Sequence, residues 1–89
     1  MTLKISVEEA KGILLHLAYY VGPAALQFLT ILRDCDVMID WDWYLLVKVF
    51  SEITDSDVLE EACYQAMERG INDMSKFENL LREVEKELE

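Results

Sequence analysis

Apolar residues in the N-terminal part of the chain recur at helical spacing, in two successive runs. The apolar positions of the first run are Val7, Ala10, Leu14, Leu17 and Val21, and those of the second are Ala25, Phe28, Leu29 and Leu32. Each run also has a more polar stripe, made of Glu9, Gly12, His16 and Tyr20 in the first and of Gln27, Thr30 and Asp34 in the second. Intervals of three and four residues place each apolar set on one face of a helix. The pattern therefore predicts two amphipathic helices, each with one face in a core.

The boundaries of these two helices follow from capping and breaking residues. Ser6 and Glu9 form a capping-box pattern, which predicts that the first helix begins at Val7. Gly22-Pro23 should end that helix, because proline lacks the backbone N–H and clashes with the preceding turn. Proline is favourable at the first position of a helix, so the second helix is expected from Pro23 to about Asp34.

Residues 12–32 contain no charged side chain, and a segment of this length is able to cross a bilayer. The Gly22-Pro23 break and the two polar stripes argue against a membrane span, so we expect two core helices of a water-soluble protein. Glu8 and Glu9 precede the uncharged segment, where a secretory signal would carry basic residues. The sequence therefore predicts a cytoplasmic protein whose two cysteines are reduced.

Three further helices are expected in the C-terminal part of the chain. Asp40 is a favourable N-cap for a helix from Trp41 to Ile53. Thr54 with Asp57 is a second capping signature, and it predicts a fourth helix that ends near Arg69, with Gly70 in the left-handed conformation. A fifth helix should follow residues 72–75 and run to the C-terminus. Its apolar face is Phe77, Leu80, Leu81, Val84 and Leu88.

Composition and length agree with a small helical domain. The 89 residues are 53% hydrophobic and include only three glycines and one proline. Few breakers and few β-branched runs favour helices over strands. We therefore predict an all-α fold, a compact bundle of four to five helices that forms a single domain over residues 1–89.

The third predicted helix has two apolar faces. One consists of Trp43, Leu46, Val47, Phe50 and Ile53, and the other of Trp41, Tyr44, Leu45 and Val49. Such a helix is either central in the bundle or uses its second face to contact another chain, including a second copy in a homodimer. Both interpretations stay open at the level of the sequence.

The charge balance narrows the classes of partner. Eighteen acidic and eight basic residues give a net charge of −10, which disfavours direct binding to nucleic acids and to anionic membranes. A partner selected by charge would have a basic surface, although acidity of this kind also serves solubility alone. Acidic residues gather around the start of the fourth helix, where we expect them on the surface: Glu52, Asp55, Asp57, Glu60 and Glu61.

Candidate catalytic and metal-binding residues are few. His16 is the only histidine, and nothing local pairs it with Cys35 or Cys63 as a nucleophile and its base. Asp34, Asp36, Asp40 and Asp42 form an aspartate cluster. Apolar residues, however, take the positions where a calcium loop has its ligand, its glycine and its closing glutamate. We therefore expect no catalytic site, metal or cofactor.

The sequence thus predicts a non-enzymatic protein-interaction module, acting as a small acidic regulator, adaptor or assembly factor. It would bind a protein partner through an acidic helical surface and an aromatic-rich helix face. The candidate contact residues are Trp41, Tyr44, Leu45, Val49, Glu52, Asp55, Asp57, Glu60 and Glu61. The first alternative is an inhibitor that mimics a nucleic acid and occupies a basic cleft, and the second is a small enzyme that uses His16 or a cysteine.

Overall fold

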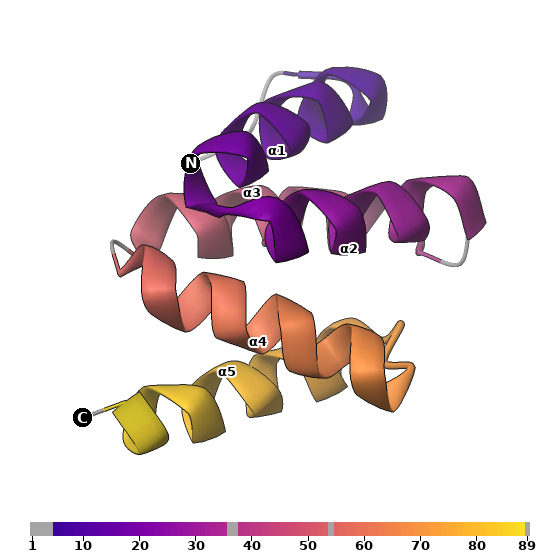
Figure 1. Ribbon diagram of the computed structural model, residues 1–89. Helices are drawn as coiled ribbons and strands as arrows, with labels where there is room; N and C mark the ends of the chain where they lie inside the picture. Colours follow the sequence, from indigo (N-terminus) through magenta and orange to yellow (C-terminus); the bar gives the residue numbers. More distant parts are fainter. Residues whose placement is uncertain (1–4, 36–37, 54, 89) are drawn as a thin grey trace.

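A computed structural model of the chain describes residues 5–35, 38–53 and 55–88. These residues form an all-α bundle of five helices (Figure 1), as the sequence predicts. The helices are α1 (Val7–Val21), α2 (Pro23–Cys35), α3 (Asp40–Glu52), α4 (Ser56–Arg69) and α5 (Met74–Leu88).

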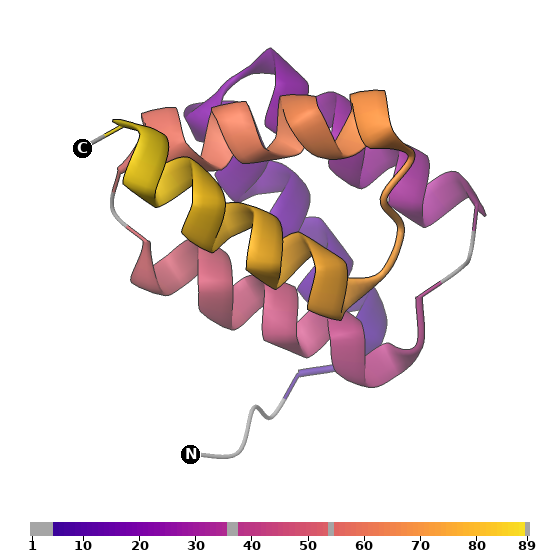
Figure 2. The same ribbon diagram turned by 90° about the horizontal axis from the view of Figure 1, so that it is seen from below.

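Successive helices run in roughly opposite directions along the bundle (Figure 1). The largest contacts join α1 to α2 and α3, α2 to α4, and α4 to α5. Seen from below, α5 lies in front of the other helices, across the space between α4 and α3 (Figure 2). Among successive helices, α1 with α2 and α4 with α5 pack as antiparallel neighbours, whereas α3 packs mainly on α1 and α4 packs on α2 as well.

One hydrophobic core unites the five helices, and every buried side chain in the described part of the chain is hydrophobic. At its centre, Phe28 of α2 stacks on Phe77 of α5 with 5.2 Å between the ring centroids. The four residues that were predicted as the core face of α2 are all buried. The predicted face of α5 is also buried except for Leu88, which is 51% exposed in the last turn, beyond the reach of the core.

The core face of α1 is turned slightly from its prediction. Ala10 and Leu14 are fully buried, but Ala18 joins them in the core, while Val7, Leu17 and Val21 are only half-buried. Val7, Leu17 and Val21, which the periodicity placed in the core, therefore lie at the edge of the core and are partly in contact with solvent.

The predicted caps have different outcomes. The Ser6 side chain accepts a hydrogen bond from the Glu9 N–H at 3.1 Å, which confirms Ser6 as the N-cap and Val7 as the first residue of α1. Gly70 has a φ of 66° and ends α4 as predicted. Asp40 is not an N-cap, because Ile39 occupies that position and α3 begins at Asp40 itself. The prediction for Thr54 falls outside the described residues, and Asp55 caps α4 by accepting from the Asp57 N–H at 3.0 Å.

The uncharged segment of residues 12–32 is divided between two helices. Gly22 is the C-cap of α1, with its N–H donating to the Ala18 carbonyl oxygen at 3.0 Å, and Pro23 begins α2. The two helices have 15 and 13 residues. Among the residues that the structure describes, no helix has the length and apolar character needed to span a membrane.

Candidate functional site

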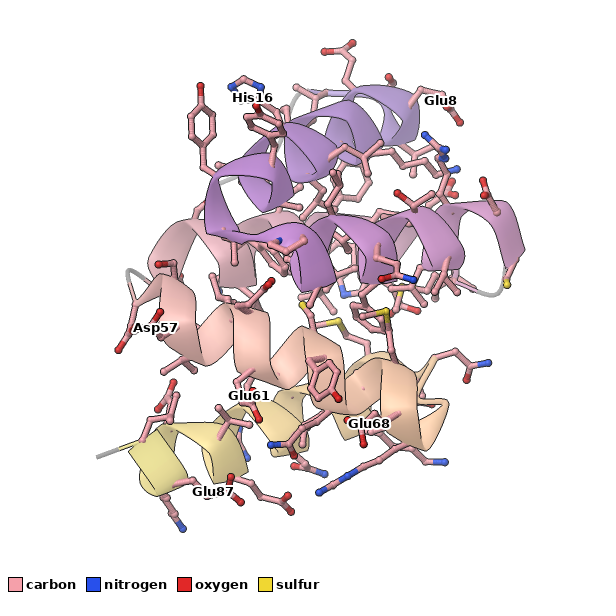
Figure 3. All side chains as sticks on the ribbon, in the orientation of Figure 1. Glu8, His16, Asp57, Glu61, Glu68 and Glu87 are labelled. Carbon is pink, nitrogen blue, oxygen red and sulfur yellow. The ribbon has the colours of Figure 1, made fainter. Side chains whose placement is uncertain are left out.

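The outer side of α4 carries a stripe of polar side chains, which we call the α4 acidic face. It consists of Asp57, Glu61, Tyr64 and Glu68, at intervals of four, three and four residues that bring them to one side of the helix. Figure 3 shows the three carboxylates along α4, in the lower half of the molecule. Asp57, Tyr64 and Glu68 are exposed, and Glu61 is half-buried.

A chain of polar contacts continues from this face to α5. Glu61 accepts a hydrogen bond from the Gln65 amide at 3.1 Å, and Arg69 donates to the Gln65 amide oxygen at 3.2 Å. Arg69 is also ion-paired with Glu83 of α5 at 3.6 Å. These contacts hold the Glu61 carboxylate in place while they leave its charge unneutralised.

The phenol of Tyr64 lies within the negative field of this face. Its pKa is raised, first by the neighbouring Glu68 carboxylate, then by desolvation and by the charge of Glu61. The ion pairs that the structure shows in its described part do not include Asp57, Glu61 or Glu68. The α4 acidic face is therefore an anionic surface with an aromatic ring in its middle, suited to accept hydrogen bonds from basic side chains.

Glu60 has a different role from its neighbours on α4. Its carboxylate accepts hydrogen bonds from the backbone N–H groups of Ala24 at 3.0 Å and Ala25 at 2.8 Å. These are free donors in the first turn of α2, so Glu60 caps that helix from across the bundle and complements its dipole. Glu60 was expected on the surface with its neighbours; it is half-buried, and its carboxylate is bound by the N-terminus of α2, which lies against α4 at this point.

The Gly22-Pro23 pair makes room for this cap. A Cβ atom on residue 22 would lie 2.5 Å from the Glu60 carboxyl carbon. The φ of Gly22 is +157°, a backbone conformation that residues other than glycine rarely adopt. Pro23 has no N–H to satisfy, so the two N–H groups that follow it donate to the two oxygens of the Glu60 carboxylate.

The remaining acidic candidates are separated by the fold. Asp55 is exposed and caps its own helix, and Glu52 is exposed in the last turn of α3. Of the five acidic residues predicted as contacts, only Asp57 and Glu61 lie on the α4 acidic face. Tyr64 and Glu68 complete it, and the spacing of 57, 61, 64 and 68 in the sequence was the signal that would have identified them.

The structure places the predicted aromatic set of α3 at the edge of the core. Trp41 is 66% exposed, whereas Tyr44, Leu45 and Val49 are half-buried and pack against buried residues. The Tyr44 hydroxyl donates a hydrogen bond to the Ile5 carbonyl oxygen at 2.8 Å, which fixes the segment before α1. Helix α3 is thus neither fully surrounded nor free along its second face.

A second exposed cluster, which sequence reasoning missed, lies on α1. We call it the α1 aromatic face: Ile13, His16, Tyr19 and Tyr20. Tyr19 and Tyr20 are 71% and 72% exposed. Edge-to-face contacts join the rings in sequence, with centroid distances of 5.1 Å between His16 and Tyr20 and 5.7 Å between Tyr19 and Tyr20. The polar stripe predicted for this helix already placed His16 and Tyr20 outward, but their character as an aromatic cluster was not recognised.

The candidate catalytic residues lie in different environments. His16 is exposed against Tyr20, Cys35 is exposed at the end of α2, and Cys63 is buried in the core. Burial, with a smaller effect of the Glu60 charge, raises the pKa of the Cys63 thiol far above its usual range, so this thiol is a poor nucleophile. Within the described part of the chain no three histidine, cysteine or acidic side chains converge as metal ligands, and Asp36 of the aspartate cluster lies outside it.

Comparisons of this chain with protein-family models, with curated proteins and with solved structures each found no match.

Proposed function

We propose that this protein is a cytoplasmic, non-enzymatic interaction module, a small acidic regulator, adaptor or assembly factor, whose α4 acidic face binds a basic surface of another protein. The observation that supports the proposal is that Asp57, Glu61 and Glu68 share one side of α4, and none of them has an ion-pair partner in the described part of the chain. The net charge of −10 adds a long-range attraction to basic partners.

The physics of such a surface fits recognition better than stabilisation. Carboxylates that are exposed and unpaired contribute little to folding, but they steer a partner of opposite charge and fix its register. Tyr64, half-exposed between Glu61 and Glu68, supplies an apolar ring with a polar tip, a residue type that often dominates binding energy at interfaces. The contact of Glu61 with Gln65 orients one of the charges before a partner arrives.

On α3, Trp41 is the exposed member of the aromatic set and the one we propose as a partner contact. Tyr44, Leu45 and Val49 would contribute through their packing against the core. We also propose that the chain self-associates into a homodimer.

A defined basic probe tests the proposed function. A synthetic helical peptide with lysines at intervals of four, three and four residues should bind ¹⁵N-labelled protein, with the largest amide shift changes over residues 57–68. Raising the salt from low to several hundred millimolar should weaken binding strongly, because the attraction is between exposed charges. A protein whose shift changes centre elsewhere, or one that does not bind the peptide at low salt, would refute the proposal.

A matched pair of variants separates the α4 acidic face from net charge alone. The double change Glu61→Gln and Glu68→Gln should weaken binding of the peptide by roughly three- to tenfold, since each exposed charge pair contributes up to about 1 kcal/mol. The double change Glu8→Gln and Glu9→Gln removes the same charge from α1. Glu8 lies at the top of Figure 3, far from the α4 acidic face, so this change should weaken peptide binding much less. Equal weakening by both would mean that only the total charge matters.

The same face also permits the second candidate, an inhibitor that mimics a nucleic acid. A photo-crosslinking amino acid in place of Tyr64 would capture the partner in cells. Competition between this protein and an oligonucleotide for the captured partner would then favour the mimic, and simultaneous binding of both would exclude it.

A further inference from the structure

The α1 aromatic face is an ordered cluster that the fold of one chain does not use. Tyr19 and Tyr20 are each more than two-thirds exposed, yet their rings contact each other edge to face, and the Tyr20 ring contacts that of His16 in the same way. Ile13 extends the cluster by one turn and is 39% exposed. A preorganised aromatic patch of this kind loses little side-chain freedom when another surface covers it.

The absence of charged side chains on the α1 aromatic face limits the kind of partner that it can bind. Residues 12–32 contain no charged side chain, in a chain with a net charge of −10, so the outer side of α1 beyond Lys11 is uncharged. A basic partner would find no counter-charge here. A second copy, by contrast, repels the first wherever acidic surfaces meet. The face from Ile13 to Tyr20 is uncharged, with Glu9 only at its N-terminal edge, so two copies that meet there oppose fewer carboxylates.

The hydrogen-bonding groups of the face also suit two-fold symmetry. In a symmetric dimer, residues near the axis meet their own copies, so a carboxylate or an ammonium there would meet a like charge. A tyrosine hydroxyl both donates and accepts, and a neutral imidazole has one donor and one acceptor. His16, Tyr19 and Tyr20 are therefore self-complementary residue types, as a two-fold contact requires.

We propose that the α1 aromatic face is the contact between two copies of this chain in a two-fold symmetric dimer. This inference rests on the proposed self-association of the chain and is independent of the basic partner. It assigns the dimer to Ile13, His16, Tyr19 and Tyr20 of α1, in place of the second face of α3 that the sequence suggested.

The size of the face sets the expected strength. Tyr19 and Tyr20 together expose roughly 300 Å² of side chain per copy, taking about 200 Å² for a whole tyrosine. Standard interfaces bury about 800 Å² per partner, so even with Ile13, His16 and the rim of α1 the contact is at the small end. The dimer should accordingly dissociate on dilution. It leaves the α4 acidic face of each copy uncovered, since His16 and the labelled acids of α4 lie on opposite parts of the bundle (Figure 3).

Sedimentation equilibrium over a range from about 1 μM to 1 mM tests the proposal. The wild-type chain should shift from monomer to dimer within this range. Tyr20→Glu should move the shift to at least tenfold higher concentration, and Tyr64→Glu, the same change at a half-exposed tyrosine of α4, should leave it unchanged. Circular dichroism of both variants at low micromolar concentration should match the wild type, because both side chains are outside the core.

Two results would overturn the inference in different ways. A wild-type chain that stays monomeric at 1 mM would remove both the dimer and its assignment to α1, while leaving the peptide-binding test of the α4 acidic face untouched. A wild-type dimer that resists Tyr20→Glu but dissociates with Trp41→Glu would assign the contact to α3 instead. Failure of the basic-peptide test alone would not affect the dimer.

A cysteine at His16, between Ile13 and Tyr20 in the proposed contact, gives a second, independent measurement. In a Cys35→Ser background, His16→Cys should form a disulfide between copies under mild oxidation, because symmetry brings residue 16 close to its own copy. Asp57→Cys, exposed on α4, is the control and should not cross-link at the same concentration. Equal cross-linking at both positions would indicate random collision and contradict the proposed geometry.

Discussion

The carboxylate of Glu60 is expected to contribute more to stability than any other charge on α4, and Glu60→Ala tests this. The change removes the acceptors of the Ala24 and Ala25 N–H groups, at 3.0 and 2.8 Å in the wild type. Hydrogen bonds to a charged group contribute about 1.5–3 kcal/mol each. This site is only partly buried, so water replaces part of the loss and we expect about 2–3 kcal/mol in total, at or above the upper end of the range for a single helix cap, because two N–H groups lose their acceptor.

This loss is large for so small a chain. A stability of roughly 4–13 kcal/mol is typical for 89 residues. At about 4–8 °C for each kcal/mol, Glu60→Ala should lower Tm by roughly 8–24 °C. Urea unfolding followed by circular dichroism at low micromolar concentration gives the free energy, and an unchanged m-value would show that the comparison is between the same two states.

The neighbouring Glu61 supplies the control. Glu61→Ala changes the same residue type one position along α4, but on the acidic face, and should alter the free energy of unfolding by about 0.5 kcal/mol or less. If Glu60→Ala and Glu61→Ala prove equally mild, the cap of α2 has no energetic importance and the reasoning is refuted.

Gly22→Ala examines the same contact from the other side. The new Cβ would displace the Glu60 carboxylate, and an alanine at position 22 would be held at an unfavourable φ. The change should therefore be as destabilising as Glu60→Ala or more. The two changes together should cost less than their sum, because the added methyl group has no carboxylate to displace once Glu60 is absent. Strict additivity would indicate that the two residues do not interact.

Three other outcomes are expected. A thiol reagent should label Cys35 in the native protein but Cys63 only after unfolding, as mass spectrometry of the labelled protein would show, because burial raises the pKa of Cys63 and depletes its thiolate. Glu68→Gln should lower the pKa of Tyr64 toward its ordinary value, since the carboxylate stabilises the protonated phenol; ultraviolet titration of the phenolate against a Tyr64→Phe reference measures it. Leu45→Glu should destabilise the fold by about 1–3 kcal/mol in urea unfolding, because the side chain is half-buried against the core, and a wild-type midpoint would contradict that packing.

The sequence predicted those parts of the fold that depend on local physics. Pro23 and Gly22 located the break between the first two helices, Gly70 ended α4, and the spacing of Phe28 with its neighbours identified the core face of α2. Each of these rests on steric restrictions or on a 3.6-residue repeat that acts within a few positions of the chain.

What the sequence did not reveal depends on which surfaces meet. Glu60 and Glu61 are adjacent and chemically identical, and only the approach of α2 makes one a cap and leaves the other on the outer face. Likewise Tyr20 and Tyr44 are both tyrosines on helices with apolar faces, but the segment before α1 covers only Tyr44. The small rotation of α1, which brings Ala18 into the core, was beyond the precision of a periodicity argument.

The cap on α2 also bears on the order in which the chain acquires its structure during synthesis. Glu60 follows Ala25 by 35 residues, so a nascent chain that has only α1 and α2 has two backbone donors at the bend with no protein acceptor. Water satisfies them in any state in which α4 is not yet docked. The bend between α1 and α2 is therefore completed by a residue from the second half of the chain, although Gly22 and Pro23, which form it, lie in the first.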